Sequence, residues 1–371
     1  MEYRKLDNLG ISSSLLGFGC MRFPLNEDGT INEPESEKML DLAIAKGVTY
    51  LDTAYPYHGG ASEPFVGKVL KKYNRSDLFL ATKLPIWEIK TKEDIDRLFN
   101  EQLKRLDVDY IDFYLLHALD KKKWETVLKL DIIEYCEEMK RQGKIKYLGF
   151  SFHDDYNTFE EIATYKKWDF CQIQYNYVDT DEQAGDKGYE LTKKLGIPVI
   201  IMEPIKGGSL ATLPKDIAGI FKEADEKASL AKWAMRWVGS KSNVKVILSG
   251  MSNLEQVKDN LETFEDFKVL TKEELKLVDQ VAEVIKSKTK NGCTGCAYCI
   301  PCPFGVNIPR NFQIWNEYSI YEDENKAKTR YAGLNEGTAD HCKACGLCEK
   351  MCPQQIKIIE DLKRVVKDMP Q

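Results

Sequence analysis

The sequence predicts an eight-stranded parallel β/α barrel followed by a small cysteine-rich domain. Across roughly the first 270 residues, eight short runs of β-branched and aromatic residues alternate with longer amphipathic stretches. Parallel neighbouring strands need a crossover helix between them, and eight such β–α units close into a barrel. In the last fifth of the chain this rhythm stops, and most of the eleven cysteines gather there.

The predicted strands are short and apolar, as expected for strands that are buried on both faces. They span residues 16–20, 48–52, 78–83, 111–117, 145–151, 170–174, 198–203 and 244–249. Helical periodicity between them is clearest at 35–46, 92–106, 124–141, 186–195 and 228–238. Before the first strand, an Asn-Leu-Gly turn at residues 8–10 predicts a hairpin that closes the bottom of the barrel.

A doubly wound open sheet is the alternative architecture for this alternation of strands and helices. Dinucleotide-binding sheets of that kind carry a G-x-G-x-x-G motif directly after the first strand. The sequence has no such motif after residues 16–20. The barrel is therefore the favoured fold.

Composition agrees with one large globular domain and a small one, because 43% of the 371 residues are hydrophobic and 30% are charged. An amphipathic helix is predicted over 271–288, and Asn291-Gly292 breaks it before the first clustered cysteine. We therefore expect a barrel domain over residues 1–288 and a second domain over 289–371.

Charge and hydropathy exclude two classes of partner. A net charge of −6 argues against nucleic acid. No apolar stretch approaches the roughly eighteen residues of a transmembrane helix, and the charged first ten residues lack the apolar core of a secretory signal. Together with reduced cysteines, these features predict a cytoplasmic protein.

The clustered cysteines form two runs, each followed by proline. They are Cys293, Cys296, Cys299 and Cys302, then Cys342, Cys345, Cys348 and Cys352. The second run has the C-x2-C-x2-C-x3-C-P spacing with which bacterial ferredoxins hold [4Fe–4S] clusters. Two runs predict a ferredoxin-like domain with two [4Fe–4S] clusters, because in two-cluster ferredoxins the fourth cysteine of each run ligates the other run's cluster.

Other readings of the cysteines are less favoured. Zinc sites usually pair two C-x2-C knuckles around one tetrahedral ion, whereas three successive cysteines at this spacing wrap a larger cluster. A disulfide framework lacks the expected secretory signal. The first run is one residue short between Cys299 and Cys302, which leaves open the cluster that Cys302 ligates. The remaining Cys20, Cys136 and Cys171 lie in apolar surroundings and are expected in the core.

Polar residues at the ends of the predicted strands form a candidate active site. Asp52, Lys83 and His117 end the second, third and fourth strands, and Tyr57 follows the second. Each alone has a structural explanation, such as a solvated lysine or a packed histidine. Barrel enzymes carry their chemistry at the carboxyl ends of the strands, so together these residues place an acid, a phenol, an ammonium and an imidazole at one mouth.

These motifs resemble the aldo-keto reductase family. The similarity rests on D-T-A-Y-P-Y at 52–57, A-T-K at 81–83, L-L-H at 115–117 and L-G-F-S at 148–151, and it extends over roughly residues 2–267. The opening Y-R-K-L and the Y-P-Y-H-G-G run are similar to a bacterial subgroup with a C-terminal ferredoxin-like extension.

The resemblance implies a catalytic tetrad for carbonyl reduction. Hydride transfer to a carbonyl carbon leaves an alkoxide that must be protonated, and Tyr57 is the expected proton donor. Lys83 would favour the phenolate and strengthen this acid, while Asp52 would hold Lys83 in place. His117 would orient the carbonyl oxygen and relay the proton. Trp87 and Phe23 are expected to line an apolar substrate pocket.

The resemblance also implies NADPH or NADH as cofactor. Ser151 and Gln172 match positions that bind the nicotinamide carboxamide, and Met202 stands where relatives stack an aromatic ring. The loop after the last strand contributes the remaining expected contacts, with Ser252 or Asn253 capping a helix that faces phosphate; they are Ser249, Ser252, Asn253, Gln256 and Asn260.

The choice between the two dinucleotides stays open on the sequence. Basic residues that hold a 2′-phosphate in many relatives are replaced here by Gly250 and Gln256. Lys206 and Lys258 are alternative cations for that phosphate.

The function that these features predict is an oxidoreductase that reduces a small carbonyl compound with NAD(P)H. Its clusters would exchange electrons with a redox partner protein or a one-electron acceptor. One alternative is a plain carbonyl reductase whose clusters are structural. Another is an electron-transfer or interaction protein whose barrel no longer transfers hydride. The sequence contains no flavin fingerprint that would join two-electron to one-electron chemistry.

Overall fold

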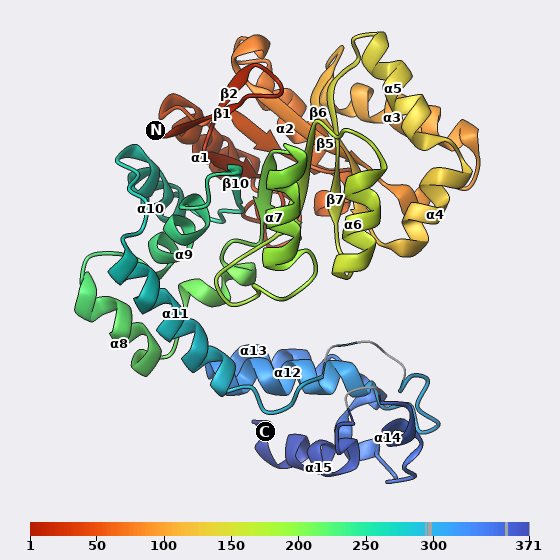
Figure 1. Cartoon of the computed structure of the whole chain (residues 1–371), viewed down its shortest axis with the longest axis vertical. Helices are drawn as coiled ribbons and strands as arrows, with labels where there is room; N and C mark the ends of the chain where they lie inside the picture. The colour runs from red at the N-terminus through yellow and green to blue at the C-terminus, as the bar shows by residue number, and fades with distance from the viewer. Residues whose placement is uncertain (294, 296–298, 353–354, 371) are drawn as a thin grey trace. The chain divides into compact units, whose positions relative to one another are not determined.

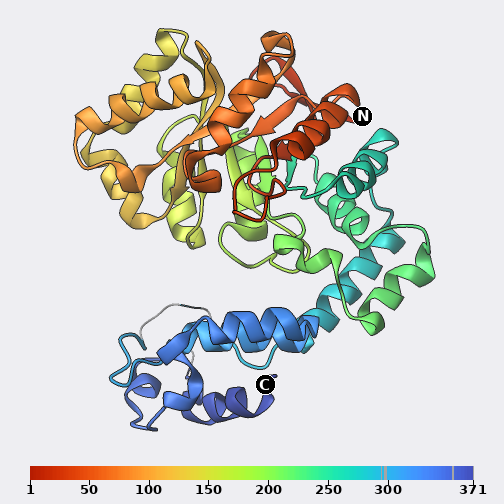
Figure 2. The same ribbon diagram turned by 180° about the vertical axis from the view of Figure 1, so that it is seen from behind.

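The computed structural model describes residues 1–293, 295, 299–352 and 355–370 (Figures 1 and 2). The chain forms two compact units. The first comprises Met1–Leu210 and Ala231–Leu275, and the second comprises Ala211–Leu230 and Lys276–Gln371. The expected domain boundary at residue 288 stays a prediction.

The first unit is built around a closed parallel barrel. Its strands follow one another around the barrel in chain order, and the last strand pairs with the first. Each lies within two residues of its predicted bounds, so the predicted barrel is confirmed. The strands are β3 (Leu16–Gly19), β4 (Tyr50–Asp52), β5 (Phe79–Leu84), β6 (Ile111–Leu119), β7 (Ile145–Phe152), β8 (Phe170–Gln174), β9 (Val199–Met202) and β10 (Val244–Ser249).

Helices connect these strands on the outside of the barrel (Figure 1). The single helix predicted over 124–141 is wrong, because two helices are separated at Asp131, whose left-handed φ of 54° interrupts helical geometry. The helices are α1 (Glu33–Ala45), α2 (Ser62–Leu70), α3 (Lys92–Leu106), α4 (Lys121–Lys129), α5 (Ile132–Arg141), α6 (Tyr156–Tyr165), α7 (Gly185–Leu195), α9 (Leu230–Gly239) and α10 (Leu254–Glu265).

The predicted N-terminal hairpin is present. Strands β1 (Tyr3–Leu6) and β2 (Ile11–Ser14) pair antiparallel. Leu6 is fully buried in one cluster with Tyr50 and Phe170, which are the first residues of β4 and β8. The hairpin therefore covers the amino-terminal end of the barrel and leaves the opposite end to the site.

The second unit has its own apolar core. Phe312, Trp315 and Leu362 are buried in it, and several cysteines pack against it. Lys288 links one helix of this unit to the C-cap of another, because its Nζ lies 3.1 Å from Asp216 of α8 and 3.0 Å from Glu322, which follows α12. The helices are α8 (Lys215–Ala224), α11 (Lys272–Ser287, which begins in the first unit), α12 (Ile308–Tyr321), α13 (Glu324–Ala332), α14 (Leu347–Met351) and α15 (Ile358–Asp368).

Short 3-10 helices complete the secondary structure: η1 (Tyr57–Gly60), η2 (Arg75–Asp77), η3 (Ile86–Glu88), η4 (Lys206–Ala211), η5 (Asn335–Gly337) and η6 (Ala339–His341). Within the described part of the chain, no helix has both the length and the apolarity that crossing a bilayer requires.

Candidate active site and cysteine cluster

The structure brings the four predicted catalytic residues to the carboxyl end of three neighbouring strands. Asp52 is the last residue of β4, Lys83 lies near the end of β5 and His117 near the end of β6. Tyr57 begins η1, the first helical turn after β4. Behind Tyr57 the chain turns through consecutive positive φ angles of 53° at His58 and 63° at Gly59. This turn explains why glycine follows the histidine.

Lys83 is the centre of the group. Lys83 is buried, with only 1% of its surface exposed. The ammonium donates hydrogen bonds to Asp52 Oδ1 at 2.7 Å, to the Thr53 carbonyl at 2.8 Å and to the Tyr57 hydroxyl at 3.3 Å. An ammonium has three donors, and all three are used here. Its charge is therefore fixed against the phenol of Tyr57.

Burial sets the protonation of this group. Burial raises the pKa of Tyr57, and the charge of Lys83 opposes that rise without reversing it. Burial alone would lower the pKa of Lys83, but Asp52 and Tyr57 hold it above its ordinary value. At neutral pH the phenol is thus protonated and the lysine is charged.

His117 is held in its neutral form. Burial lowers its pKa well below the ordinary value, and the charge of Lys83 lowers it further. Its Nδ1 is buried without a hydrogen-bond partner. The indole of Trp87 lies beside the imidazole, with ring centroids 5.0 Å apart, and the Tyr57 ring is 6.4 Å away. A buried ring nitrogen without a partner is costly, so it marks a place for a bound polar atom.

The predicted nicotinamide contacts lie on the adjacent strands. Ser151 Oγ accepts a hydrogen bond from the Ala118 amide at 2.7 Å. Gln172 Nε2 lies 3.5 Å from the sulfur of Met202, while Gln172 Oε1 is buried without a partner. An unsatisfied acceptor at this end of the barrel fits the amide donor of a carboxamide.

The remaining residues expected to contact the cofactor also organise the loop between β10 and α10, and their cofactor contacts stay predictions. Asn260 donates to Ser249 Oγ at 2.9 Å. Asn253, rather than Ser252, caps α10 by accepting from the Gln256 amide at 2.9 Å. Gln256 Oε1 in turn accepts from the Ser252 amide at 2.7 Å. Asn253 and Gln256 thus stabilise the N-terminus of α10, and Asn260 ties this helix to the end of β10. Sequence reasoning did not assign these roles to Gln256 or Asn260.

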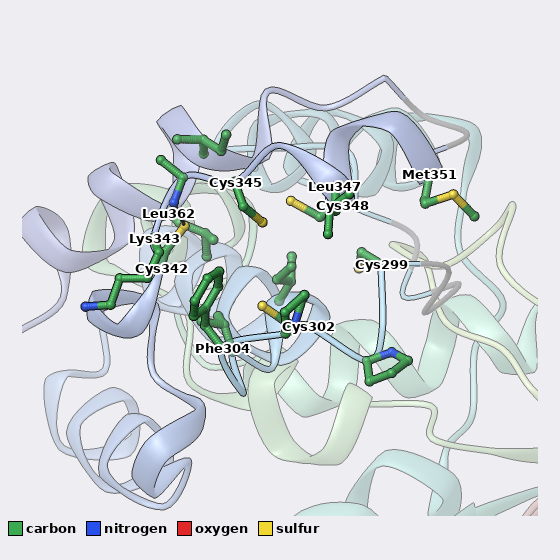
Figure 3. Close-up of a pocket in the computed structure, with 16 residues that line it drawn as sticks. Cys299, Cys302, Phe304, Cys342, Lys343, Cys345, Leu347, Cys348, Met351 and Leu362 are labelled. Carbon is green, nitrogen blue, oxygen red and sulfur yellow. Dashed lines mark hydrogen bonds between the residues drawn. The ribbon is translucent and has the colours of Figure 1, made fainter.

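The cysteines of the two runs meet at one cavity in the second unit (Figure 3). Its volume is about 100 Å³. Cys302, Cys345 and Cys348 are drawn with their sulfur atoms toward this space, and the wall is otherwise mostly apolar, including Phe304 and Leu347. The thiols that line it are Cys299, Cys302, Cys342, Cys345 and Cys348.

The cavity fits an iron–sulfur cluster. Thiols of both runs surround this space, and the rest of its lining is mostly apolar. An all-sulfur donor set in an apolar shell is the environment of such clusters. Cys293 and Cys352 are half-buried near the same core, and Cys296 lies outside the described residues.

The model of the aldo/keto reductase family matches residues 15–283, most of the barrel unit. The chain belongs to the aldo/keto reductase family. A 4Fe-4S dicluster domain matches residues 292–359, so this aldo/keto reductase carries a C-terminal iron–sulfur domain.

Two relatives and one solved structure illustrate the similarity. Probable aldo-keto reductase 1 of Glycine max is 31% identical over 215 residues, and the chain spans 59% of that relative. That alignment takes in 55% of this chain. The uncharacterized oxidoreductase YqkF of Bacillus subtilis is 27% identical, over 74% of this chain and 95% of that protein. The holo form of AKR11C1 from Bacillus halodurans superposes with a TM-score of 0.65 at 27% identity, over 76% and 96% of the two chains.

In this aldo/keto reductase, a buried hydrogen-bond network lies behind Lys83. Glu63 is fully buried and accepts from Thr82 at 2.7 Å and from Gln102 at 2.8 Å. Gln102 also donates to the Lys83 carbonyl at 3.0 Å. Sequence reasoning missed this network, because a glutamate on a helix is usually a surface residue.

Proposed function

We propose that this aldo/keto reductase reduces a small carbonyl compound with NADPH or NADH, using Asp52, Tyr57, Lys83 and His117. The observation that carries the proposal is the buried Lys83 ammonium, which lies 2.7 Å from the Asp52 carboxylate and 3.3 Å from the Tyr57 phenol. A buried ammonium shared between an acid and a protonated phenol suits transfer of the phenolic proton.

The proton transfer follows from these contacts. When bound, the reduced nicotinamide supplies a hydride to the carbonyl carbon. Tyr57 gives its hydroxyl proton to the carbonyl oxygen, so the product is an alcohol and the tyrosine is left as phenolate. The hydrogen bond from Lys83 stabilises that phenolate in a site with little water. Asp52 keeps Lys83 charged and in place, and solvent returns the proton to Tyr57.

The other residues position the reactants. Neutral His117 donates a ring N–H to the carbonyl oxygen without competing with Tyr57 as an acid. Ser151, Gln172 and Met202 hold the nicotinamide, with the free Gln172 Oε1 as acceptor for its carboxamide. Trp87, 44% exposed at the mouth, gives the substrate an apolar wall. Ser249, Ser252, Asn253, Gln256 and Asn260 shape the adjoining loop.

We further propose two [4Fe–4S] clusters in the C-terminal domain. Cys299 and Cys302 both line the common cavity with three thiols of the second run. We assign Cys302, the fourth cysteine of its run, to one ligand set with Cys342, Cys345 and Cys348. Cys293, Cys296, Cys299 and Cys352 would then form the other, in the crossed arrangement of two-cluster ferredoxins. Such clusters, when bound, pass single electrons, which suits a redox partner protein or a one-electron acceptor.

We also propose that the barrel domain ends at residue 288 and that the cluster domain begins at residue 289.

The test is the rate of NADPH and NADH oxidation with a panel of small aldehydes and ketones, measured anaerobically. Tyr57→Phe should lower kcat/KM about a hundredfold or more, the range for a lost general acid, and should leave dinucleotide binding nearly unchanged. Tyr55→Phe is the matched control, since its hydroxyl contacts Glu101 at 3.4 Å rather than Lys83. Wild-type turnover by Tyr57→Phe would refute the proposed mechanism.

A further inference from the structure

The cations considered for the cofactor phosphates are differently placed in the structure. Lys206 is committed to Asp179, with 2.6 Å from its Nζ to Oδ2. Lys258 lies a full turn into α10, and Gln256 is used in the cap of that helix. Another basic residue, Arg22, approaches both loops that follow the last two barrel strands, at Gly250 and Gly207.

Arg22 follows β3, the first barrel strand, and its side chain crosses the loop after β10. A Cβ at Gly250 would lie only 2.5 Å from Arg22 Cγ and 3.0 Å from Arg22 Cβ. Glycine at 250 therefore leaves the space through which this side chain passes. Ser252 Oγ donates to the Arg22 carbonyl at 2.9 Å and ties the two loops together.

The guanidinium reaches the loop after β9. Its Nη2 lies 3.9 Å from the position that a Cβ of Gly207 would take, and Glu203 Oε2 lies 3.5 Å from the same position. Strands β9, β10 and β3 are neighbours in the barrel. Within the described part of the chain, the Arg22 guanidinium has neither a hydrogen bond nor an ion pair. It is exposed and available to an anion.

We propose that Arg22 binds a phosphate group of the nicotinamide dinucleotide, an inference that rests on the proposed function. Barrel enzymes bind phosphate with the loops after their last two strands, and Arg22 reaches both of those loops here. The adjacent N-terminus of α10 adds a favourable dipole. The planar guanidinium offers several N–H donors to phosphate oxygens. The cation thus comes from the loop after the first strand, although its target lies at the last two.

The experiment measures dissociation constants of NADPH and NADH for the full-length holoenzyme by quenching of tryptophan fluorescence. Arg22→Met should raise at least one of them about tenfold to a hundredfold, since charge-assisted hydrogen bonds are lost. The dissociation constants of Arg22→Lys should lie between those of the wild type and Arg22→Met, because lysine keeps the positive charge but lacks the planar set of N–H donors of a guanidinium. Arg141→Met removes one exposed charge from α5 and is the control. A loss for NADPH alone identifies the 2′-phosphate, and an equal loss for both identifies the pyrophosphate.

A second variant avoids dependence on the folding of Arg22→Met. Gly250→Ala places a methyl group where the Arg22 side chain passes and should weaken binding in the same direction by a smaller factor. If the wild type binds a dinucleotide and both Arg22→Met and Gly250→Ala bind it equally well, the assignment of Arg22 is wrong. If the wild type binds neither NADPH nor NADH, the proposed function itself is wrong.

Discussion

The barrel mouth and the cysteine cavity are stabilised in different ways. At the mouth, the reactive side chains already contact one another: Lys83 has three acceptors within 3.3 Å, and Gln102 holds its carbonyl from behind. At the cavity, Cys302, Cys342 and Cys348 pack on an apolar core, and the Ala344 amide donates to Cys342 Sγ at 3.4 Å. The barrel site is therefore preorganised by the protein, whereas the cysteine site would gain its order from the metal.

This difference predicts which property a substitution in each region should change. Substitutions at the barrel mouth should change catalysis or cost folding free energy through unpaired buried groups. Substitutions among the cysteines should change metal content first. Among the described residues, the core around Phe312 and Trp315 has its members between Cys293 and Met369, within the second unit. The two sites should thus fail separately.

The largest expected effect is on the cysteine side. Cys345→Ser removes a thiol from the cavity wall and should reduce iron and sulfide from about eight to about four per chain. Reduction of a one-electron acceptor should be abolished, while carbonyl reduction stays within about twofold, because the four barrel residues are untouched. Colorimetric iron and sulfide assays and both activities are measured on anaerobically purified protein.

Cys136→Ser is the matched control, since Cys136 is a fully buried cysteine of the barrel unit. It should keep the full metal content. Loss of carbonyl reduction in Cys345→Ser, with the barrel still folded, would contradict the separation of the two sites. Zinc without sulfide in the wild type would contradict the clusters themselves.

The next effect concerns the network behind Lys83. Gln102 makes buried hydrogen bonds to the Lys83 carbonyl at 3.0 Å, to Glu63 at 2.8 Å and to the Tyr114 hydroxyl at 2.7 Å. Gln102→Leu removes all three of these hydrogen bonds. We expect the free energy of unfolding to fall by about 2–4 kcal/mol, measured by urea denaturation. The control Gln142→Leu, at the exposed C-cap position that follows α5, should cost less than about 0.5 kcal/mol. Equal costs for the two variants would show that the network does not stabilise the barrel.

Sequence reasoning succeeded where a pattern had one physical cause. The barrel strands are buried on both faces, so their apolar runs marked them to within two residues. Parallel strands bring their carboxyl ends together, so Asp52, Lys83 and His117 were expected at one mouth. The structure places them there. Their catalytic roles stay predictions, as do the cluster ligands.

Sequence reasoning failed where one residue type can serve two purposes. Glu63 and Gln102 resemble surface helix residues, yet they are fully buried, because their partners come from neighbouring elements of the fold. Gln256 also closes the cap of α10, a role that sequence reasoning did not assign, while its contact with the cofactor stays a prediction. Asp131 interrupts an amphipathic pattern that reads as one helix, since a left-handed φ leaves the periodicity of hydrophobic residues intact. Such choices depend on contacts between segments distant in sequence.

The smallest expected effect follows from protonation at the mouth. Burial, followed by the charges of Lys83, His153 and Lys123, lowers the pKa of His117 well below its ordinary value. Below about pH 6.5 the unfolded chain therefore binds a proton at this residue that the folded chain does not. As the pH is lowered through this range, the free energy of unfolding should therefore decrease. The share of this residue is at most about 1.4 kcal/mol per pH unit, until the pKa of the folded state is reached. In His117→Leu this contribution to the pH dependence disappears. Urea denaturation at pH 7, 6 and 5 measures it as the difference between the two proteins in the slope of the unfolding free energy against pH. An unchanged slope in His117→Leu would mean that the imidazole at the barrel mouth is not desolvated, in contrast to the preorganised site described above.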